Sequence, residues 1–173
     1  MLCIPMILVV YFDEFFKNLV KRLKENNVDF EIVKYENLEN FLLSNSNTIN
    51  KVIITGSKKR ILREHDFPLL ETFMKQNIKI IGICFGFQYL AYKTGGKLVE
   101  CEKFVGIRNT EAGEHIYFNH YDRIIDLPKK WKIIAKIDGF INIAATEKWL
   151  GFQFHPEKNA KNFTHYILPF LLS

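Results

Sequence analysis

Cysteines are few in this chain, and they follow no shared spacing. Its 173 residues contain three cysteines, Cys3, Cys84 and Cys101, and no Cys-x-x-Cys pair. Neither a disulfide framework nor a cysteine-rich metal site is therefore expected. Cys3 and Cys101 belong to no motif, and we expect both to be inert. Such cysteine usage is typical of a reducing compartment, so we predict a cytoplasmic protein with no metal and no other cofactor.

Long apolar runs and segments of biased composition are also lacking. The apolar stretch 2–12 is too short to span a bilayer and has neither a basic leader nor a small-residue cleavage site. We assign it to a first strand, and we expect no membrane association. No repeat, linker or low-complexity stretch divides the sequence, so residues 1–173 are predicted to form a single domain.

The excess of positive charge is small and dispersed. The chain has 24 lysines and arginines and 19 acidic residues, which gives a net charge of +5 at pH 7. Dispersed lysines are typical of a solvated surface, so no nucleic-acid partner is expected. A denser cluster holds Lys58, Lys59, Arg60 and Arg63. We interpret it as a solvated face; the alternative is that it borders a site and attracts an acidic or phosphate-bearing molecule.

Strand-like and helix-like patterns alternate along the first half of the chain. Short apolar, β-branched runs predict strands over 4–12, 30–35, 51–55 and 78–83. Helical spacing of apolar residues predicts helices over 15–23, 66–76 and 85–92. This alternation predicts an α/β fold with a mainly parallel central sheet flanked by helices, in which ligands bind at the carboxyl ends of the strands. A few short antiparallel strands are expected over 97–154, followed by an amphipathic helix over 163–172.

Cys84 lies where the fourth strand pattern gives way to helical spacing. Gly82 and Gly86 flank it at minus two and plus two, which is the spacing of a nucleophile elbow. A free thiol has a pKa of about 8.5, and the N-terminus of a helix favours its thiolate form. We therefore predict that Cys84 is a nucleophile.

His155 and Glu157 supply the groups that such a nucleophile needs. They follow a strand-like stretch, 149–154, and alternate side chains of a strand share one face, so we expect the two side by side. A carboxylate bonded to Nδ1 fixes the imidazole tautomer and leaves Nε2 to accept the thiol proton. Singly, each residue is more often structural, but together Cys84, His155 and Glu157 predict a Cys-His-Glu catalytic triad.

These segments resemble the class I (triad-type) glutamine amidotransferases. The nucleophile motif of that family, Gly-x-Cys-x-Gly-x-Gln, is matched by Gly82, Cys84, Gly86 and Gln88. Its base motif, Gly-x-Gln-Phe-His-Pro-Glu, is matched by residues 151–157. The stretch 119–128 also resembles the Ser-His-x-Asp-x-Val-x-x-Leu-Pro segment of GMP synthetase glutaminase domains. The resemblance implies the flavodoxin-like fold of this family.

The resemblance also implies an activity and further site residues. The implied reaction is hydrolysis of the side-chain amide of L-glutamine through a glutamyl thioester. The oxyanion hole would consist of backbone N–H groups from Phe85 and from the loop of Gly56 and Ser57. Gln88, His120 and Asp122 are expected near the substrate. Each of these three also has a structural interpretation, as a loop-holding amide, a satisfied histidine and a turn cap respectively.

Three functions remain open from the sequence. The chain has no ATP-binding P-loop, so the first is a glutaminase subunit that passes ammonia to a separate synthetase in trans. The second is a γ-glutamyl amide hydrolase, since enzymes of that type share the elbow. The third is a non-catalytic or partner-gated relative. GMP synthetase-like domains usually carry Gly-Gly-Pro where this chain has Gly56, Ser57 and Lys58, and a serine costs strain if that position takes positive φ.

Overall fold

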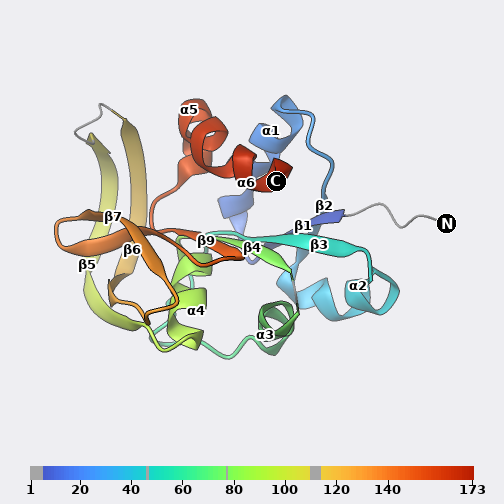
Figure 1. Ribbon diagram of the computed structural model, residues 1–173, viewed down its shortest axis with the longest axis horizontal. Coiled ribbons are helices and arrows are strands. Elements are labelled where there is room, and N and C mark those ends of the chain that lie inside the picture. The colour runs from blue at the N-terminus through green and yellow to red at the C-terminus, as the bar shows by residue number, and fades with distance from the viewer. Residues whose placement is uncertain (1–5, 46, 77, 110–113) are drawn as a thin grey trace.

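A seven-stranded sheet forms the centre of the molecule (Figure 1). The computed structural model describes residues 6–45, 47–76, 78–109 and 114–173, so Cys3 and the start of the predicted first strand lie outside the described residues. The strand order is β2-β1-β3-β4-β9-β8-β7. The bounds are Met6–Tyr11 (β1), Glu31–Lys34 (β2), Ile49–Ile54 (β3), Lys79–Ile83 (β4), Lys132–Ile137 (β7), Phe140–Ala145 (β8) and Trp149–Phe152 (β9).

Most neighbours in this sheet are parallel. Strands β2, β1, β3, β4 and β9 pair in parallel, whereas β8 pairs antiparallel with β9 and with β7. Alternate residues of each central strand face opposite sides, so Ile54 and Ile80 belong to one buried cluster and Ile53 and Ile81 to the other. The predicted α/β class with a mainly parallel sheet is confirmed.

Helices cover both faces of the sheet (Figure 1). One face carries α2 (Leu38–Asn45), α3 (Pro68–Lys75) and α4 (Phe85–Lys93), and the other carries α1 (Lys17–Glu25), α5 (Ala160–Asn162) and α6 (Leu168–Leu172). Helix α2 was not expected from the sequence. The stretch predicted as one helix, 163–172, is helical throughout, but its first half is a π turn, Phe163–Ile167, followed by α6, where Pro169 has no N–H to donate. No helix in the described part of the chain is long and apolar enough to cross a bilayer.

A long β-hairpin stands apart from the central sheet. Strands β5 (Lys97–Asn109) and β6 (His115–Asp126) have 13 and 12 residues and form a separate antiparallel pair, where the sequence predicts short strands. Phe104 lies opposite His120 in the register. The even-numbered side chains of β6 from Ile116 to Ile124 are buried under the hairpin. The stretch 119–122 is therefore part of a strand and not a loop.

We predict that Gly86→Ala destabilises the protein. The Cβ of an alanine at Gly86, in the first turn of α4, would overlap the backbone carbonyl oxygen of Ile54 and lie 2.9 Å from the Ile54 Cβ. Alanine in a helix is otherwise favoured over glycine by about 1 kcal/mol. Because β3 cannot move aside without disturbing the sheet, the free energy of unfolding should fall by about 2–3 kcal/mol. Urea denaturation measures it, and an unchanged or higher stability would contradict the close packing of α4 on β3.

Candidate active site

Cys84 occupies the sharp turn between β4 and α4. Its backbone has φ 51° and ψ −103°, which is unusual for a residue other than glycine. The Cys84 N–H donates a 2.6 Å hydrogen bond to the carbonyl of Phe152, which fixes the turn against β9. Strained residues of this kind persist where the surrounding structure holds them, and they cluster at functional sites. The thiol thus lies at the carboxyl end of β4 and at the N-terminus of α4.

A buried imidazole and a buried carboxylate lie next to each other beyond β9. The Nδ1 of His155 is 2.7 Å from the Oε1 of Glu157, and both side chains are at most 1% exposed. The alternation argument for this pair is wrong, because β9 ends at Phe152 and Glu157 lies in a 3₁₀ turn, Pro156–Lys158. The turn, and not strand alternation, brings the two groups together.

Further contacts orient the His155 ring. The backbone N–H of His155 donates to the Tyr117 carbonyl at 2.8 Å, and the ring of Phe15 stacks on the imidazole with centroids 5.4 Å apart. Among the described residues, His155 Nε2 has no hydrogen-bond partner, so it is available to a proton donor. Burial disfavours a charged imidazole, but the Glu157 carboxylate and the Cys84 thiol outweigh it and raise the pKa of His155 to about 10.

Amide side chains pack beneath the cysteine. The Cys84 sulfur lies 3.6 Å from the backbone carbonyl oxygen of Asn119 and 3.9 Å from the side-chain Nε2 of Gln153. Gln88, from the next turn of α4, donates through Nε2 to the Asp122 carbonyl at 2.6 Å and to the Gln153 Oε1 at 3.2 Å. The Gln88 amide nitrogen therefore ties the nucleophile helix to β6, in agreement with its structural interpretation.

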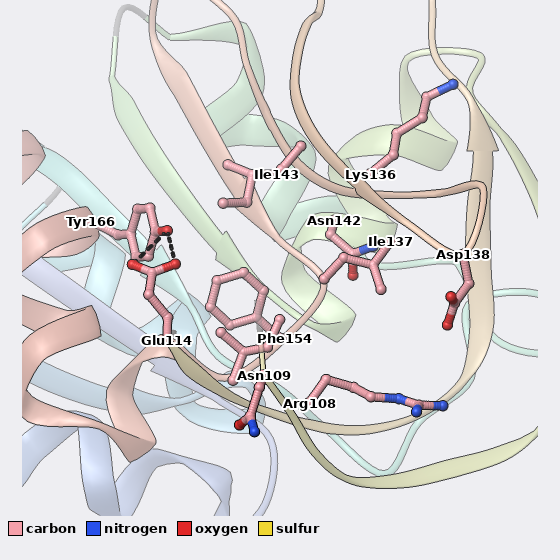
Figure 2. Close-up of a pocket in the computed structure, with 12 residues that line it drawn as sticks. Arg108, Asn109, Glu114, Lys136, Ile137, Asp138, Asn142, Ile143, Phe154 and Tyr166 are labelled. Carbon is pink, nitrogen blue, oxygen red and sulfur yellow. Dashed lines mark hydrogen bonds between the residues drawn. The ribbon is translucent and has the colours of Figure 1, made fainter. Parts of the chain in front are cut away.

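A pocket of about 310 Å³ opens beside the Cys84 thiol. The three residues expected near a substrate, Gln88, His120 and Asp122, all line it. Its rim is basic, with Lys58, Lys59, Arg60 and Lys103. A larger cavity of about 660 Å³ lies between the hairpin and the β7–β8 edge (Figure 2). That cavity contains neither Cys84 nor His155, so it is not the candidate site.

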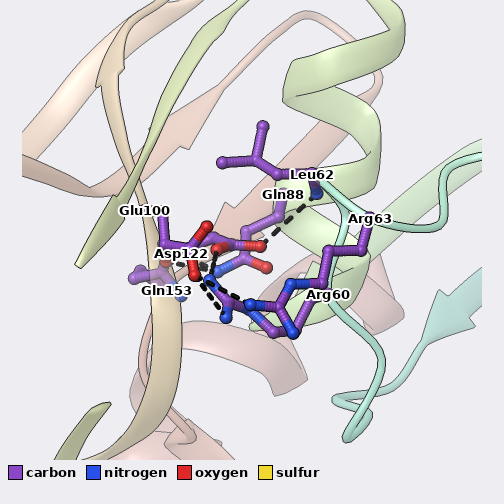
Figure 3. A network of polar contacts seen from close by, with 7 residues as sticks. All are labelled: Arg60, Leu62, Arg63, Gln88, Glu100, Asp122 and Gln153. Carbon is purple, nitrogen blue, oxygen red and sulfur yellow. Dashed lines mark hydrogen bonds and ion pairs between the residues drawn. The ribbon is translucent and has the colours of Figure 1, made fainter. Parts of the chain in front are cut away.

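Asp122 is the centre of a polar network (Figure 3). Its Oδ1 lies 2.6 Å from Arg60 Nη2, and this arginine also contacts Glu100 at 2.7 Å. Arg63 lies 3.1 Å from the same glutamate, and Lys59 pairs with Glu64 at 2.8 Å. The basic cluster is thus neither wholly solvated nor wholly free for a ligand. The Asp122 carboxylate does not cap its own turn: it anchors Arg60 from the loop after β3.

His120 is buried on the inner side of the hairpin, with 7% of its surface exposed. Its Nδ1 has no hydrogen-bond partner among the described residues, so the satisfied-histidine interpretation fails at this atom. Burial, with Arg123 and His155 nearby, lowers the pKa of His120 to about 4. The ring is therefore neutral at pH 7, beside a base whose pKa is raised.

The lowered pKa of His120 predicts a loss of stability in mild acid. Below pH 6.5 the unfolded chain takes up a proton on this histidine, whereas the folded chain does so only near pH 4. Stability from this group is complete above pH 6.5 and falls as the pH drops, by about 2–3 kcal/mol at pH 4.5. Urea unfolding of the wild type and His120→Asn at pH 7.0 and 4.5 tests this. Equal losses in both proteins would contradict it.

The loop after β3 lies against both the nucleophile and the base. A Cβ added at Gly56 would lie 2.7 Å from the Cε1 of His155 and 3.6 Å from the Cβ of Cys84, so glycine is required for this approach. Ser57 is buried, and it is not among the described non-glycine residues with positive φ. The strain expected from a serine at this position is therefore absent.

Sequence reasoning missed two residues next to this loop. Asp13 and Phe15 follow β1 and lie close to Ser57 and His155 respectively. A signal was present, because the carboxyl end of β1 reaches the same sheet edge as Cys84. Gln153 and Asn119 were part of quoted motifs without an assigned role.

Comparison with known proteins decides the family. The model of the family described as "Glutamine amidotransferase class-I" matches residues 7–172. The chain belongs to the class I glutamine amidotransferases. This membership confirms both the resemblance stated from the motifs and the expected class of enzyme, a glutamine amidotransferase.

Relatives of this class I amidotransferase include longer proteins. This chain is 28% identical over 167 residues to a glutamine-hydrolyzing GMP synthase of Malacoplasma penetrans, and the matched region covers 87% of this chain and 32% of the relative. It is 30% identical over 155 residues to the GMP synthase of Bacteroides fragilis, covering 79% of this chain and 30% of the relative. The chain thus spans about a third of the length of these curated relatives.

Solved structures share the fold of this amidotransferase. A putative GMP synthase subunit from Thermoplasma acidophilum superposes with a TM-score of 0.76 at 20% identity, covering 96% of this chain and 94% of that one. A glutamine amidotransferase from Thermotoga maritima gives a TM-score of 0.65 at 18% identity, covering 96% and 82%.

Proposed function

We propose that this chain hydrolyses the side-chain amide of L-glutamine through a Cys84-His155-Glu157 triad. The observation that carries the proposal is the placement of a strained cysteine at a helix N-terminus, beside a His155–Glu157 pair that is 2.7 Å apart and buried. The Glu157 carboxylate holds the His155 ring by Nδ1, and Nε2 takes the thiol proton. The raised pKa of His155 favours this proton transfer, because the imidazolium is stable beside the thiolate.

The reaction proceeds in two halves at this site. The Cys84 thiolate attacks the amide carbon, and the oxygen becomes an oxyanion, which receives N–H groups of Phe85 and of the Gly56 and Ser57 loop. His155 gives its proton to the departing nitrogen, so ammonia leaves and a glutamyl thioester remains. Water, deprotonated by His155, then attacks the thioester carbon. Glutamate leaves, and the thiol is restored.

We assign the glutamine side of the pocket to residues on β6 and α4. His120 lies at the pocket wall, and its Nδ1 has no partner within the described ranges, so its neutral ring can hydrogen-bond with a polar substrate group. Gln88 and Asp122 also line the pocket, but their contacts with Gln153 and Arg60 make them supports of its wall. Their contribution to binding is therefore through the placement of Cys84 and His120.

We further propose that the ammonia passes to a synthetase on a separate chain in the cytoplasm. The GMP synthases matched by this chain are about three times its length, whereas the Thermoplasma protein has nearly the same extent. The observation that supports a synthetase in trans is the likeness to the Thermoplasma protein, which is described as a putative GMP synthase subunit and is covered over 94% of its length. A neighbouring gene for an ATP-dependent synthetase identifies the candidate partner.

Release of glutamate and ammonia by the purified protein tests the function. The protein is given L-glutamine and a panel of γ-glutamyl amides, with and without the candidate synthetase. Glutamine turnover supports the proposal. Preference for a substituted γ-glutamyl amide makes the chain a γ-glutamyl hydrolase instead, and no turnover under any condition makes it a non-catalytic relative.

A further inference from the structure

Asp13 lies between β1 and the 3₁₀ turn before α1. Its two carboxylate oxygens accept hydrogen bonds from two segments, the loop after β3 and the 3₁₀ turn itself. Oδ2 accepts hydrogen bonds from the Ser57 hydroxyl at 2.9 Å and from the Lys58 N–H at 2.7 Å. Oδ1 accepts one from the Phe15 N–H at 3.3 Å, where Asp13 caps a short 3₁₀ turn, Glu14–Phe16. A single side chain therefore joins the loop after β3 to the segment after β1.

Both segments lie against the His155 ring, and the loop after β3 also approaches Cys84. The loop after β3 approaches both the His155 ring and Cys84 through Gly56. The segment after β1 presents Phe15, whose ring stacks on the same imidazole. Asp13 thus fixes the relative position of a loop beside the nucleophile and a ring beside the base.

Some backbone N–H groups of this loop are used in hydrogen bonds that hold the loop, and others are left for a ligand. The Lys58 N–H is used by Asp13, and the Lys59 N–H donates to the Ser57 hydroxyl oxygen at 3.0 Å. In the described part of the chain, the N–H groups of Gly56 and Ser57 have no acceptor. The loop therefore keeps two unused donors next to Cys84, while Asp13 holds the residues that follow them.

We infer that Asp13 is a positioning residue that orients the oxyanion donors of the Gly56 and Ser57 loop. This inference rests on the proposed function. The chain lacks the second glycine and the proline that GMP synthetase-like domains usually carry at this loop. A proline restricts a loop through its ring. In this chain the loop is restricted instead by hydrogen bonds to the Asp13 carboxylate, and the Ser57 hydroxyl is one of the donors. Ser57 therefore contributes to the hydrogen bonds that hold the loop, and it does not impair the site.

The test separates oxyanion stabilisation from reactivity of the thiol. In Asp13→Ala we expect kcat for glutamine to fall about 10–100-fold, with KM changed by less than about threefold. Complete loss of an oxyanion donor costs about 10²–10³-fold in kcat, and the effect should be smaller here because the donor is misplaced and not removed. Alkylation of Cys84 by iodoacetamide forms no oxyanion, so its rate should stay within about twofold of the wild-type rate. Asp13→Asn keeps the size of the side chain but only one acceptor oxygen, and we expect an intermediate kcat.

Two further variants serve as controls. Glu14→Gln removes the neighbouring exposed carboxylate, which lies 3.7 Å from Lys17 Nζ, and it should leave kcat unchanged. Ser57→Ala combined with Asp13→Ala should lower kcat less than the product of the two single effects, because both remove the same contact.

Several results would overturn the inference. Wild-type kcat in both Asp13 variants, or alkylation that slows in parallel with turnover, would show that Asp13 does not orient oxyanion donors. Those results leave the proposed function intact if the wild type hydrolyses glutamine. A wild type that turns over no γ-glutamyl amide would overturn the proposed function and this inference together.

Discussion

Replacing Cys84 with alanine is expected to lower kcat for glutamine hydrolysis by about 10⁴-fold or more, to the background of the assay. Loss of the nucleophile of a comparable triad costs about 10⁶-fold, because no other group can form the covalent intermediate. Here the thiol lies in the pocket at the N-terminus of α4, close to His155, whose Nε2 has no hydrogen-bond partner in the part of the chain that the structure describes. Initial rates of glutamate release by both proteins measure the effect.

Cys101 provides a matched control for this substitution. It is a free, half-buried cysteine on β5, in the hairpin, and does not line the pocket beside Cys84. Cys101→Ala should keep kcat within about twofold, while iodoacetamide should still inactivate that variant through Cys84. Turnover by Cys84→Ala within tenfold of the wild-type rate would contradict a thioester mechanism. An inactive Cys101→Ala with a native fold would place the nucleophile on the hairpin.

The sequence could indicate the elbow at Cys84 and the closeness of His155 and Glu157 because these signals are local. Gly82 and Gly86 predict the elbow from spacing alone, and the structure shows that Gly86 permits close packing against Ile54. His155 and Glu157 are two residues apart, so any tight conformation brings their side chains together. For that reason the pair could be predicted from the wrong element, a strand in place of a 3₁₀ turn.

The supports of the site could not be predicted in the same way, because they join distant segments. Asp13 and Ser57 are 44 residues apart, and Arg60 and Asp122 are 62 apart. No periodicity in either segment encodes such a partner, since it depends on the order of strands in the sheet and on the register of the hairpin. Charge alone favoured a solvated cluster at Arg60, whereas its guanidinium is held between two carboxylates.

The hairpin shows a further limit of pattern reading. Strands β5 and β6 contain polar residues on both faces, and their register shifts between Glu100 and Phe104. The alternating pattern is weak because the polar residues His120 and Asp122 occupy the buried face of β6 and an irregularity interrupts the pairing. The structural interpretation of His120 and Asp122 assumes a loop. Instead, a strand places His120 at the wall of the pocket that Cys84 also lines, and it places Asp122 against Arg60.

Glu157→Gln is expected to lower kcat by about 10³–10⁴-fold, close to the cost of the equivalent change in a serine protease triad. Glutamine has nearly the same shape as Glu157, so the fold should persist, but it carries no charge to stabilise the imidazolium. Its amide can also present N–H₂ to Nδ1, which favours the wrong tautomer of His155. The readout is kcat for glutamine, with Glu147→Gln, an exposed carboxylate between β8 and β9, as the control that should keep full activity.

The pH dependence of the same variant distinguishes an electrostatic role of Glu157 from a packing role. In the wild type, Glu157 and Cys84 raise the pKa of His155 to about 10, so the imidazolium formed when Nε2 takes the thiol proton keeps that proton through neutral pH and supplies it to the leaving ammonia. Activity should therefore decline only as the pH approaches 10. Without the Glu157 charge that pKa falls, and the alkaline decline of kcat should begin at lower pH.

The raised pKa of His155 also makes the free energy of unfolding depend on pH. A histidine whose folded pKa exceeds its unfolded value of about 6.5 stabilises the fold fully below pH 6.5, and that contribution is lost as the pH rises through about 10. Between pH 7 and 9.5 the wild type should thus lose more stability than Glu157→Gln in urea unfolding. If the two proteins lose equal stability and the alkaline decline does not move, Glu157 acts by packing alone. The large drop in kcat must then come from the orientation of the ring, because the charge would have no effect on the proton that His155 holds.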